Sequence, residues 1–99
     1  MPGLVDISTL IEFPAERYGR PCLAGTGMYL YRVIDLHRMG MSVDEMHSQF
    51  PDVPHGHFYA ALAFYYANRE ECERAMDERD SEANRLNAEH IAAQKIRAR

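Results

Sequence analysis

The sequence predicts a mainly α-helical protein with a short N-terminal β-ribbon, a three-helix unit containing a helix-turn-helix, and a long C-terminal helix. Ser42 followed by Glu45 has the spacing of a capping box, and Pro51 ends the helix that this box starts, because proline lacks an N–H. From Phe58 onward, apolar residues recur at i, i+3, i+4, i+7 and i+8, which is the helical period. No proline or glycine follows Phe58, so residues 69–97 are expected to be helical.

Length and composition are those of one folded domain. The chain has 99 residues, of which 46% are hydrophobic and 10% aromatic, and its formal net charge is −4. A chain this short buries a modest core, which a partner chain would extend. An acidic chain is also a poor non-specific binder of nucleic acid, so any such role requires a local cluster of Arg or Lys.

The sequence favours a cytoplasmic location. It contains no apolar run of the length that spans a membrane, and its N-terminus lacks the basic start and apolar core of a signal peptide. In that reducing compartment, Cys22 and Cys72 are expected to be free, buried, small hydrophobic residues rather than a disulfide.

Residues 1–68 are predicted to form the ribbon and the three helices. Two short apolar stretches, Leu10–Phe13 and Cys22–Ala24, are the strand candidates, and they are expected to pair and to pack on the helices. Gly40 is expected to close the first helix in a left-handed conformation. The three helices are expected over Leu30–Met39, Val43–Phe50 and about His55–Asn68. The predicted core consists of Leu30, Val33, Ile34, Val43, Met46, Phe50, Phe58, Leu62 and Tyr65.

Residues 69–99 are predicted to form a C-terminal helical arm that binds a partner. Acids dominate residues 70–82 and cations dominate residues 83–99, an order that complements the helix dipole. The arm carries too few large apolar groups to pack on the domain along its whole length, and an isolated helix is marginal in water. It is expected to lay a thin apolar stripe on a second copy, giving a homodimer, or on another protein. The apolar residues of this stripe are Met76, Leu86, Ile91 and Ile96.

Four motifs, in order, resemble the family catalogued as domain of unknown function 433. Gly19–Thr26 resembles its G-(K/R)-P-x-(I/L)-x-G-T signature, and Met39–Met46 resembles its G-x-S-x-E-E-I segment. Phe50-Pro51 and Tyr59–Tyr65 are similar to its aromatic-Pro and A-A-L-x-Y segments. The resemblance covers about residues 7–75, with the motifs in the family's order and spacing.

The resemblance implies a homeodomain-like three-helix fold and a role as the antitoxin half of a toxin–antitoxin pair, beside a PIN-like ribonuclease toxin. It therefore implies a non-catalytic regulator that binds the toxin, with DNA as a further candidate partner. The sequence departs from the family pattern at Gly27, where the family usually has Arg after Gly-Thr, and the helix beginning near His55 contains no Arg or Lys. If nucleic acid is bound, contact is therefore expected from Arg20, Arg32, Arg38 and Arg69. The alternative is a dimeric structural or interaction module that has lost nucleic-acid binding.

Other candidate sites have a simpler interpretation. His55 and His57, with His47, could bind a metal ion, but residues at i and i+2 of a helix point to different sides, so exposure at a helix start is preferred. The aromatic side chains could stack on bases, although at helical spacing core or interface packing is preferred. No serine or cysteine has a base at a spacing that marks a nucleophile. No catalytic residue, metal or cofactor is therefore expected.

Overall fold

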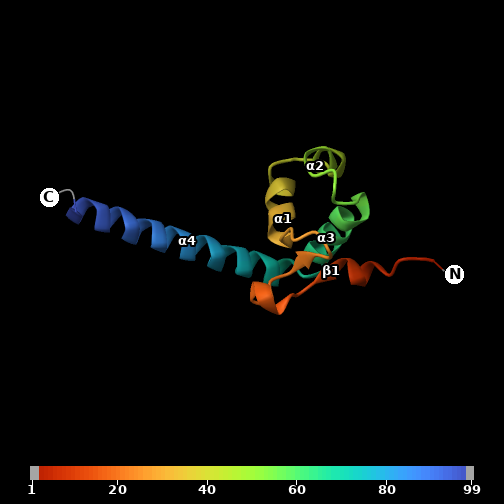
Figure 1. The fold of residues 1–99 in the computed structure, drawn as a ribbon, viewed down its shortest axis with the longest axis horizontal. Helices are drawn as coiled ribbons and strands as arrows, with labels where there is room; N and C mark the ends of the chain where they lie inside the picture. The colour runs from red at the N-terminus through yellow and green to blue at the C-terminus, as the bar shows by residue number, and fades with distance from the viewer. Residues whose placement is uncertain (1–2, 98–99) are drawn as a thin grey trace. The chain divides into compact units, whose positions relative to one another are not determined.

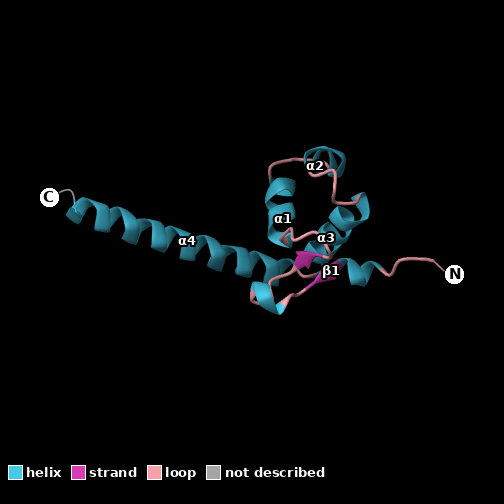
Figure 2. Ribbon diagram, in the orientation of Figure 1, coloured by secondary structure: helices cyan, strands magenta, loops and turns pink. Residues whose placement is uncertain are grey.

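The structure is a computed structural model that describes the backbone of residues 3–97 and the side chains of residues 3–86. It is mainly helical, with a two-stranded antiparallel sheet near the N-terminus and a long C-terminal helix, as the sequence predicts (Figure 1; Figure 2). The chain divides into two compact units, Met1–Asn68 and Arg69–Arg99. The first unit contains the sheet and the helices α1 (Leu30–Arg38), α2 (Val43–Gln49) and α3 (His55–Ala67), and the second contains the helix α4 (Arg69–Arg97).

The N-terminal ribbon consists of β1 (Ile11–Glu12) and β2 (Cys22–Leu23). The strands pair antiparallel, with Ile11 opposite Leu23. They lie within the two predicted stretches but are shorter, because each pairs over only two residues. Both strands contact α3 (His55–Ala67), so the ribbon packs on the helices as predicted.

Two 3-10 helices flank β1. The first, η1 (Ile7–Leu10), is capped by Asp6, whose carboxylate accepts a hydrogen bond from the Ser8 N–H over 3.0 Å. The second, η2 (Ala15–Arg17), ends at Tyr18, which adopts a left-handed conformation with φ 60°. η2 lies in the loop that turns the chain from β1 back to β2.

The first helix, α1 (Leu30–Arg38), ends in a Schellman motif. The N–H of Gly40 donates to the carbonyl of His37 over 3.0 Å, and the N–H of Met41 donates to the carbonyl of Leu36 over 3.1 Å. Gly40 has φ +86°, a conformation that glycine adopts without steric cost. The prediction of a glycine-closed first helix is confirmed.

The second helix, α2 (Val43–Gln49), starts with the predicted capping box. The Glu45 N–H donates to Ser42 Oγ over 3.1 Å, and the Ser42 N–H donates to Glu45 Oε1 over 3.2 Å. Residues 50–54 then connect α2 to α3, which begins directly after Pro54. This helix–turn–helix order is the one that the sequence predicts.

The core of the first unit is built around α3, which contacts α1, α2, η1 and both strands. Phe58 and Tyr65 of α3 are buried, as are the predicted core residues Leu30, Val33, Ile34, Val43 and Met46. The prediction was wrong for Leu62 and Phe50, which are only half-buried. Leu62 was misplaced because α3 is apolar on every side, so periodicity alone does not select its buried face. Phe50 was misplaced because it ends α2 in a non-helical conformation that takes it off the helix face.

A single residue, Asn68, separates α3 from α4 (Arg69–Arg97). Its φ of −130° and ψ of 40° are not helical, and its side-chain amide donates to the carbonyl of Phe64 over 3.0 Å. Asn68 therefore ends α3 and does not merely interrupt it. Beyond this residue, α4 is 29 residues long, in agreement with the absence of helix breakers in the sequence.

The predicted stripe on α4 is described in part. Met76 is buried, together with Cys72 of the same helix, and Leu86 is exposed. The side chains of Ile91 and Ile96 lie outside the described residues. Between residues 3 and 97, no helix combines the length and the apolar character that crossing a membrane requires.

Candidate functional site

A groove of about 510 Å³ opens between two loops of the first unit. One wall is the segment Thr26–Tyr29, which leads into α1, together with Arg32 of that helix. The other wall is Gln49–Val53, which contains the end of α2 and the connection toward α3. The lining combines two aromatic rings, a guanidinium, a carboxylate and the exposed backbone of a glycine. Such a mixture of apolar surface and a few polar groups is typical of a binding site.

Thr26 fixes the shape of the first wall. Its hydroxyl donates to the Leu23 carbonyl over 2.8 Å and accepts from the Met28 N–H over 3.1 Å. The Leu23 N–H in turn donates to the Met28 carbonyl over 2.8 Å. Gly25 and Gly27 flank the threonine with φ of +72° and +73°, so the loop turns twice through conformations that favour glycine. The Gly-Thr-Gly sequence thus specifies a closed and well-braced loop.

Arg17, the last residue of η2, lies against this wall. Its Nη1 donates to the Gly27 carbonyl over 3.1 Å, and its Cζ lies 5.4 Å from the centre of the Tyr29 ring, a cation–π arrangement. Its Nη2 is 3.2 Å from the position that a Cβ on Gly27 would take. No sequence pattern marks Arg17 as part of a site. The available signal was the glycine at position 27, which leaves room for a guanidinium from elsewhere in the chain.

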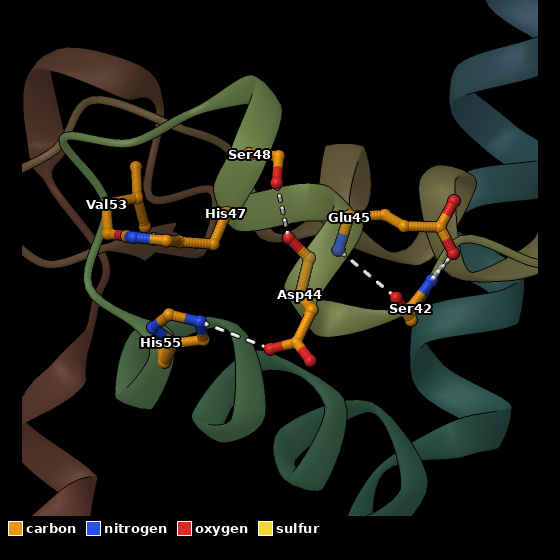
Figure 3. Close-up of polar contacts among 7 residues, drawn as sticks. All are labelled: Ser42, Asp44, Glu45, His47, Ser48, Val53 and His55. Atoms are coloured by element: carbon orange, nitrogen blue, oxygen red, sulfur yellow. Dashed lines mark hydrogen bonds and ion pairs between the residues drawn. The ribbon is translucent and has the colours of Figure 1, made fainter.

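His47 braces the second wall (Figure 3). Its Nδ1 is 2.8 Å from the Val53 carbonyl oxygen, and because a carbonyl only accepts, Nδ1 must carry the proton. The His47 ring also lies against the His55 ring, with 3.9 Å between their centres and 33° between their planes. His55 Nε2 is 3.3 Å from Asp44 Oδ1. These contacts connect α2, the groove wall and the first turn of α3.

The histidines do not form a metal site in the part of the chain whose side chains are described, where no group of three His, Cys, Asp or Glu is arranged to hold an ion. His55 stacks on His47 rather than pairing with His57. This follows from helix geometry, because residues at i and i+2 point to different sides of α3. We interpret the His47–His55 pair as a brace for the groove.

One of the four arginines predicted to contact nucleic acid, Arg32, lines the groove. Arg20 and Arg38 are exposed but are not part of its lining. Arg69 begins the second unit, where its Nε lies 3.8 Å from Glu73 Oε1. The sequence of α3 contains no Arg or Lys, so the helix that would enter a major groove carries no fixed cation.

The tyrosines of α3 have different environments. Tyr65 is buried, whereas Tyr59 and Tyr66 are exposed. The Tyr66 hydroxyl is 2.7 Å from His37 Nε2, and the two rings meet edge to face with their centres 5.7 Å apart. Tyr65 therefore belongs to the core, and Tyr66 joins the ends of α3 and α1.

Comparison with known proteins gives one family. The model of a family described as "Protein of unknown function (DUF433)" matches residues 14–65. This region contains the ribbon's second strand, all three helices of the first unit except the last residues of α3, and both walls of the groove. No curated protein and no solved structure matches the chain in the corresponding comparisons.

Proposed function

The chain belongs to the DUF433 family, and from this premise we propose that it is a non-catalytic, antitoxin-like regulator that binds a PIN-like ribonuclease toxin through α4. The protein would act in the cytoplasm, where such a toxin reaches its RNA substrates. The first unit would supply a compact scaffold, and the second unit would supply the segment that recognises the toxin.

The observation that carries the proposal is the length and surface of α4. The helix runs from Arg69 to Arg97 as a unit of its own. From residue 77 to residue 86, every side chain but that of Arg79 is exposed, and the exposed groups are mostly charged. A helix with so little apolar surface is marginal in water, and it gains stability when a partner covers it.

The charge of α4 indicates what kind of partner it fits. Its first half, residues 70–82, contains seven acidic side chains and two arginines. Local ion pairs such as Arg85 with Glu82, at 2.7 Å, are exposed and contribute little to stability. A ribonuclease must present cations to the phosphates of RNA. An acidic helix can occupy such a surface in place of RNA and so block the enzyme.

The proposal includes contact with DNA as a secondary role. Arg20 and Arg38 of the first unit are exposed cations outside the groove, and a homodimer would present them twice. The acidic net charge and the absence of cations from α3 favour weak contact with the phosphate backbone over base readout. If DNA is not bound at all, the alternative function is a dimeric interaction module that has lost nucleic-acid binding.

The experiment is inhibition of a PIN-like ribonuclease encoded beside this chain, measured with purified proteins. The test variant Glu70→Lys/Glu78→Lys reverses two exposed charges on α4. The control Glu16→Lys/Met39→Lys/Ser48→Lys makes the same change of net charge at three exposed positions of the first unit that do not line the groove. We expect the parent chain and the control to inhibit and the α4 variant to lose most inhibition. Equal behaviour of the two variants, or no inhibition by the parent, would reject the proposal.

A further inference from the structure

The first unit exposes large apolar side chains near its N-terminus. The N-terminal segment, Leu4–Ile7, leaves Leu4 69%, Val5 67% and Ile7 66% exposed. In Figure 1 the chain before η1 runs away from the helices of its own unit. Three large aliphatic side chains within four residues form an apolar patch of the kind that marks an interaction site.

The groove between the two loops has the chemistry to receive such a segment. Met28 and Phe50 of the lining are half-buried, and Pro51 is exposed, so part of the lining offers apolar contact. Arg32 and Asp52 are exposed charged residues of the lining. A groove with one cation, one carboxylate and several apolar side chains suits a mostly aliphatic peptide better than a phosphate backbone.

The N-terminal segment matches this lining in charge as well as in apolar character. Its one charged side chain is Asp6, which stands between Val5 and Ile7. Hydrogen bonds from the side chain and backbone of Ser8 lower the pKa of Asp6, so the carboxylate keeps its charge at neutral pH. Arg32 of the groove is the complementary cation.

The 3-10 helix η1, from which the N-terminal segment extends, lies close to one wall of the groove. Leu10 at the end of η1 has Cδ1 3.9 Å from the position that a Cβ on Gly56 would take, in the first turn of α3. Val53, which lines the groove, lies three residues before Gly56 in the chain. The four residues 3–6 can extend by at most about 13 Å from η1. Two copies that face each other near this turn are therefore able to exchange their segments over a short distance.

We propose that the groove between Thr26–Arg32 and Gln49–Val53 binds the N-terminal segment of a second copy of this chain, so that two copies exchange segments reciprocally. Within one chain the segment stays in solvent and does not fold back on its own unit. A twofold arrangement would cover both segments and both grooves at once, because an isologous interface uses the same surface on both copies. Val5 would enter the apolar part of the groove while Asp6 meets Arg32.

Disulfide trapping across two differently labelled full-length chains tests the exchange. One chain carries Val5→Cys and the other carries Asp52→Cys, and they are mixed in equal amounts with oxidised glutathione. The native Cys22 and Cys72 are buried, and the parent chain treated alike is the blank. The control pair replaces Asp52→Cys by Met39→Cys, because Met39 is 75% exposed and does not line the groove.

We expect a cross-linked heterodimer between the two introduced thiols that forms at least about fivefold faster than in the control pair. Equal rates in the two pairs, or no heterodimer, would overturn the proposal. A double variant carrying both substitutions in one chain must also yield linked dimers, since closure within the monomer alone means that the segment fills its own groove.

Charge exchange gives a second, independent measurement on uncross-linked protein. Arg32→Asp and Asp6→Arg should each raise the dimer dissociation constant by about three- to fivefold in sedimentation, the magnitude of one exposed ion pair. The double variant should return it toward the parent value. Arg20→Asp is the matched control, because Arg20 is exposed outside the groove lining. If the double variant is no better than the worse single variant, the proposed pairing of Asp6 with Arg32 is wrong.

Discussion

The guanidinium of Arg17 and the carbonyl of Gly27 are joined by a hydrogen bond of 3.1 Å, although nine residues, including both residues of β2, lie between them in the chain. Arg17 Nη2 also lies 3.2 Å from the position that a Cβ on Gly27 would take. The guanidinium can therefore hold this position because residue 27 has no side chain. This pair shapes the wall of the groove from outside the groove loop itself.

The dependence predicts a graded effect of alanine at the two loop glycines. Gly25 and Gly27 have the same φ within a degree, but nothing lies within 4 Å of a Cβ on Gly25. Gly25→Ala should cost about 1–2 kcal/mol from the left-handed conformation alone. Gly27→Ala should cost more, because the new methyl group crowds Arg17 Nη2 and requires the guanidinium to shift slightly from its hydrogen bond with the Gly27 carbonyl. Chemical denaturation of both variants measures the difference, and in an Arg17→Ala background the excess should disappear.

The capping box of α2 predicts a local loss of stability when its serine is removed. Ser42→Ala leaves the Glu45 N–H without its acceptor and should lower the free energy of unfolding by about 1 kcal/mol. Ser48→Ala is the control in the same helix, because the Ser48 hydroxyl only bonds the carbonyl of Asp44, which the helix can do without. Equal destabilisation by the two variants would contradict the role of the box.

The corrected burial of α3 predicts two different costs for truncation. Phe58 is completely buried, so Phe58→Ala should lower the free energy of unfolding by about 3–5 kcal/mol. Leu62 is half-buried, so Leu62→Ala should lower the free energy of unfolding by about 2 kcal/mol or less, which is the low end of the range for a core leucine. Urea denaturation compares them, and a larger loss for Leu62→Ala would mean that the other face of α3 is the core face.

The two cysteines predict a loss of stability in alkali. Burial raises the pKa of the Cys22 thiol, and burial followed by the charges of Glu71 and Glu73 raises the pKa of the Cys72 thiol. The folded chain therefore keeps these protons to a higher pH than the unfolded chain, whose thiols titrate near about 8.5. The stabilisation is complete below that pH. It is lost as the pH rises through the pKa values that the two thiols have in the folded chain.

Two measurements check the cysteine prediction. The free energy of unfolding should decline above about pH 8.5 in the parent chain, and less steeply in Cys22→Ala/Cys72→Ala. In addition, alkylation of the native protein without reductant should be slow, while the denatured protein should take up two labels. Rapid labelling of the native protein, or fewer than two labels after denaturation, would contradict free and buried thiols.

The distribution of arginines predicts weak, salt-dependent binding to DNA. A gel shift on the DNA upstream of the chain's own coding sequence should show binding only at low salt, because each phosphate contact releases counterion. Arg38→Ala and Arg20→Ala should each reduce it similarly for all sequences, as backbone contacts do. Tight, sequence-specific binding at high salt would instead require base readout by a surface other than the cation-free α3.

The elements that the sequence predicts correctly are those with local causes. The box between Ser42 and Glu45, the glycine at position 40 and the breaker at Pro51 each act within one turn of chain, so a single segment determines the outcome. The predicted ribbon was also confirmed, since Leu10–Phe13 and Cys22–Ala24 were the apolar stretches between the prolines and glycines of the N-terminal region.

The groove depends on contacts that no local pattern specifies. Arg17 reaches Gly27 only because Tyr18 turns the chain through a left-handed conformation, and His47 meets His55 only once the connection between α2 and α3 has folded. The same reason explains the buried residues that the core prediction omitted. Leu36 and Val53 are buried, although neither stands on a strongly periodic face.

The position of α3 in the chain has a consequence for synthesis on the ribosome. Between His55 and Ala67 the helix contains no Asp, Glu, Lys or Arg, so it is the stretch most exposed to aggregation while unprotected. Its contacts in the first unit come from η1, β1, β2, α1 and α2, all of which precede it. When α3 emerges, each of these covering elements has already left the exit tunnel. Translation therefore produces the most aggregation-prone helix of the first unit after all the elements that cover it, so α3 can be buried as soon as it emerges.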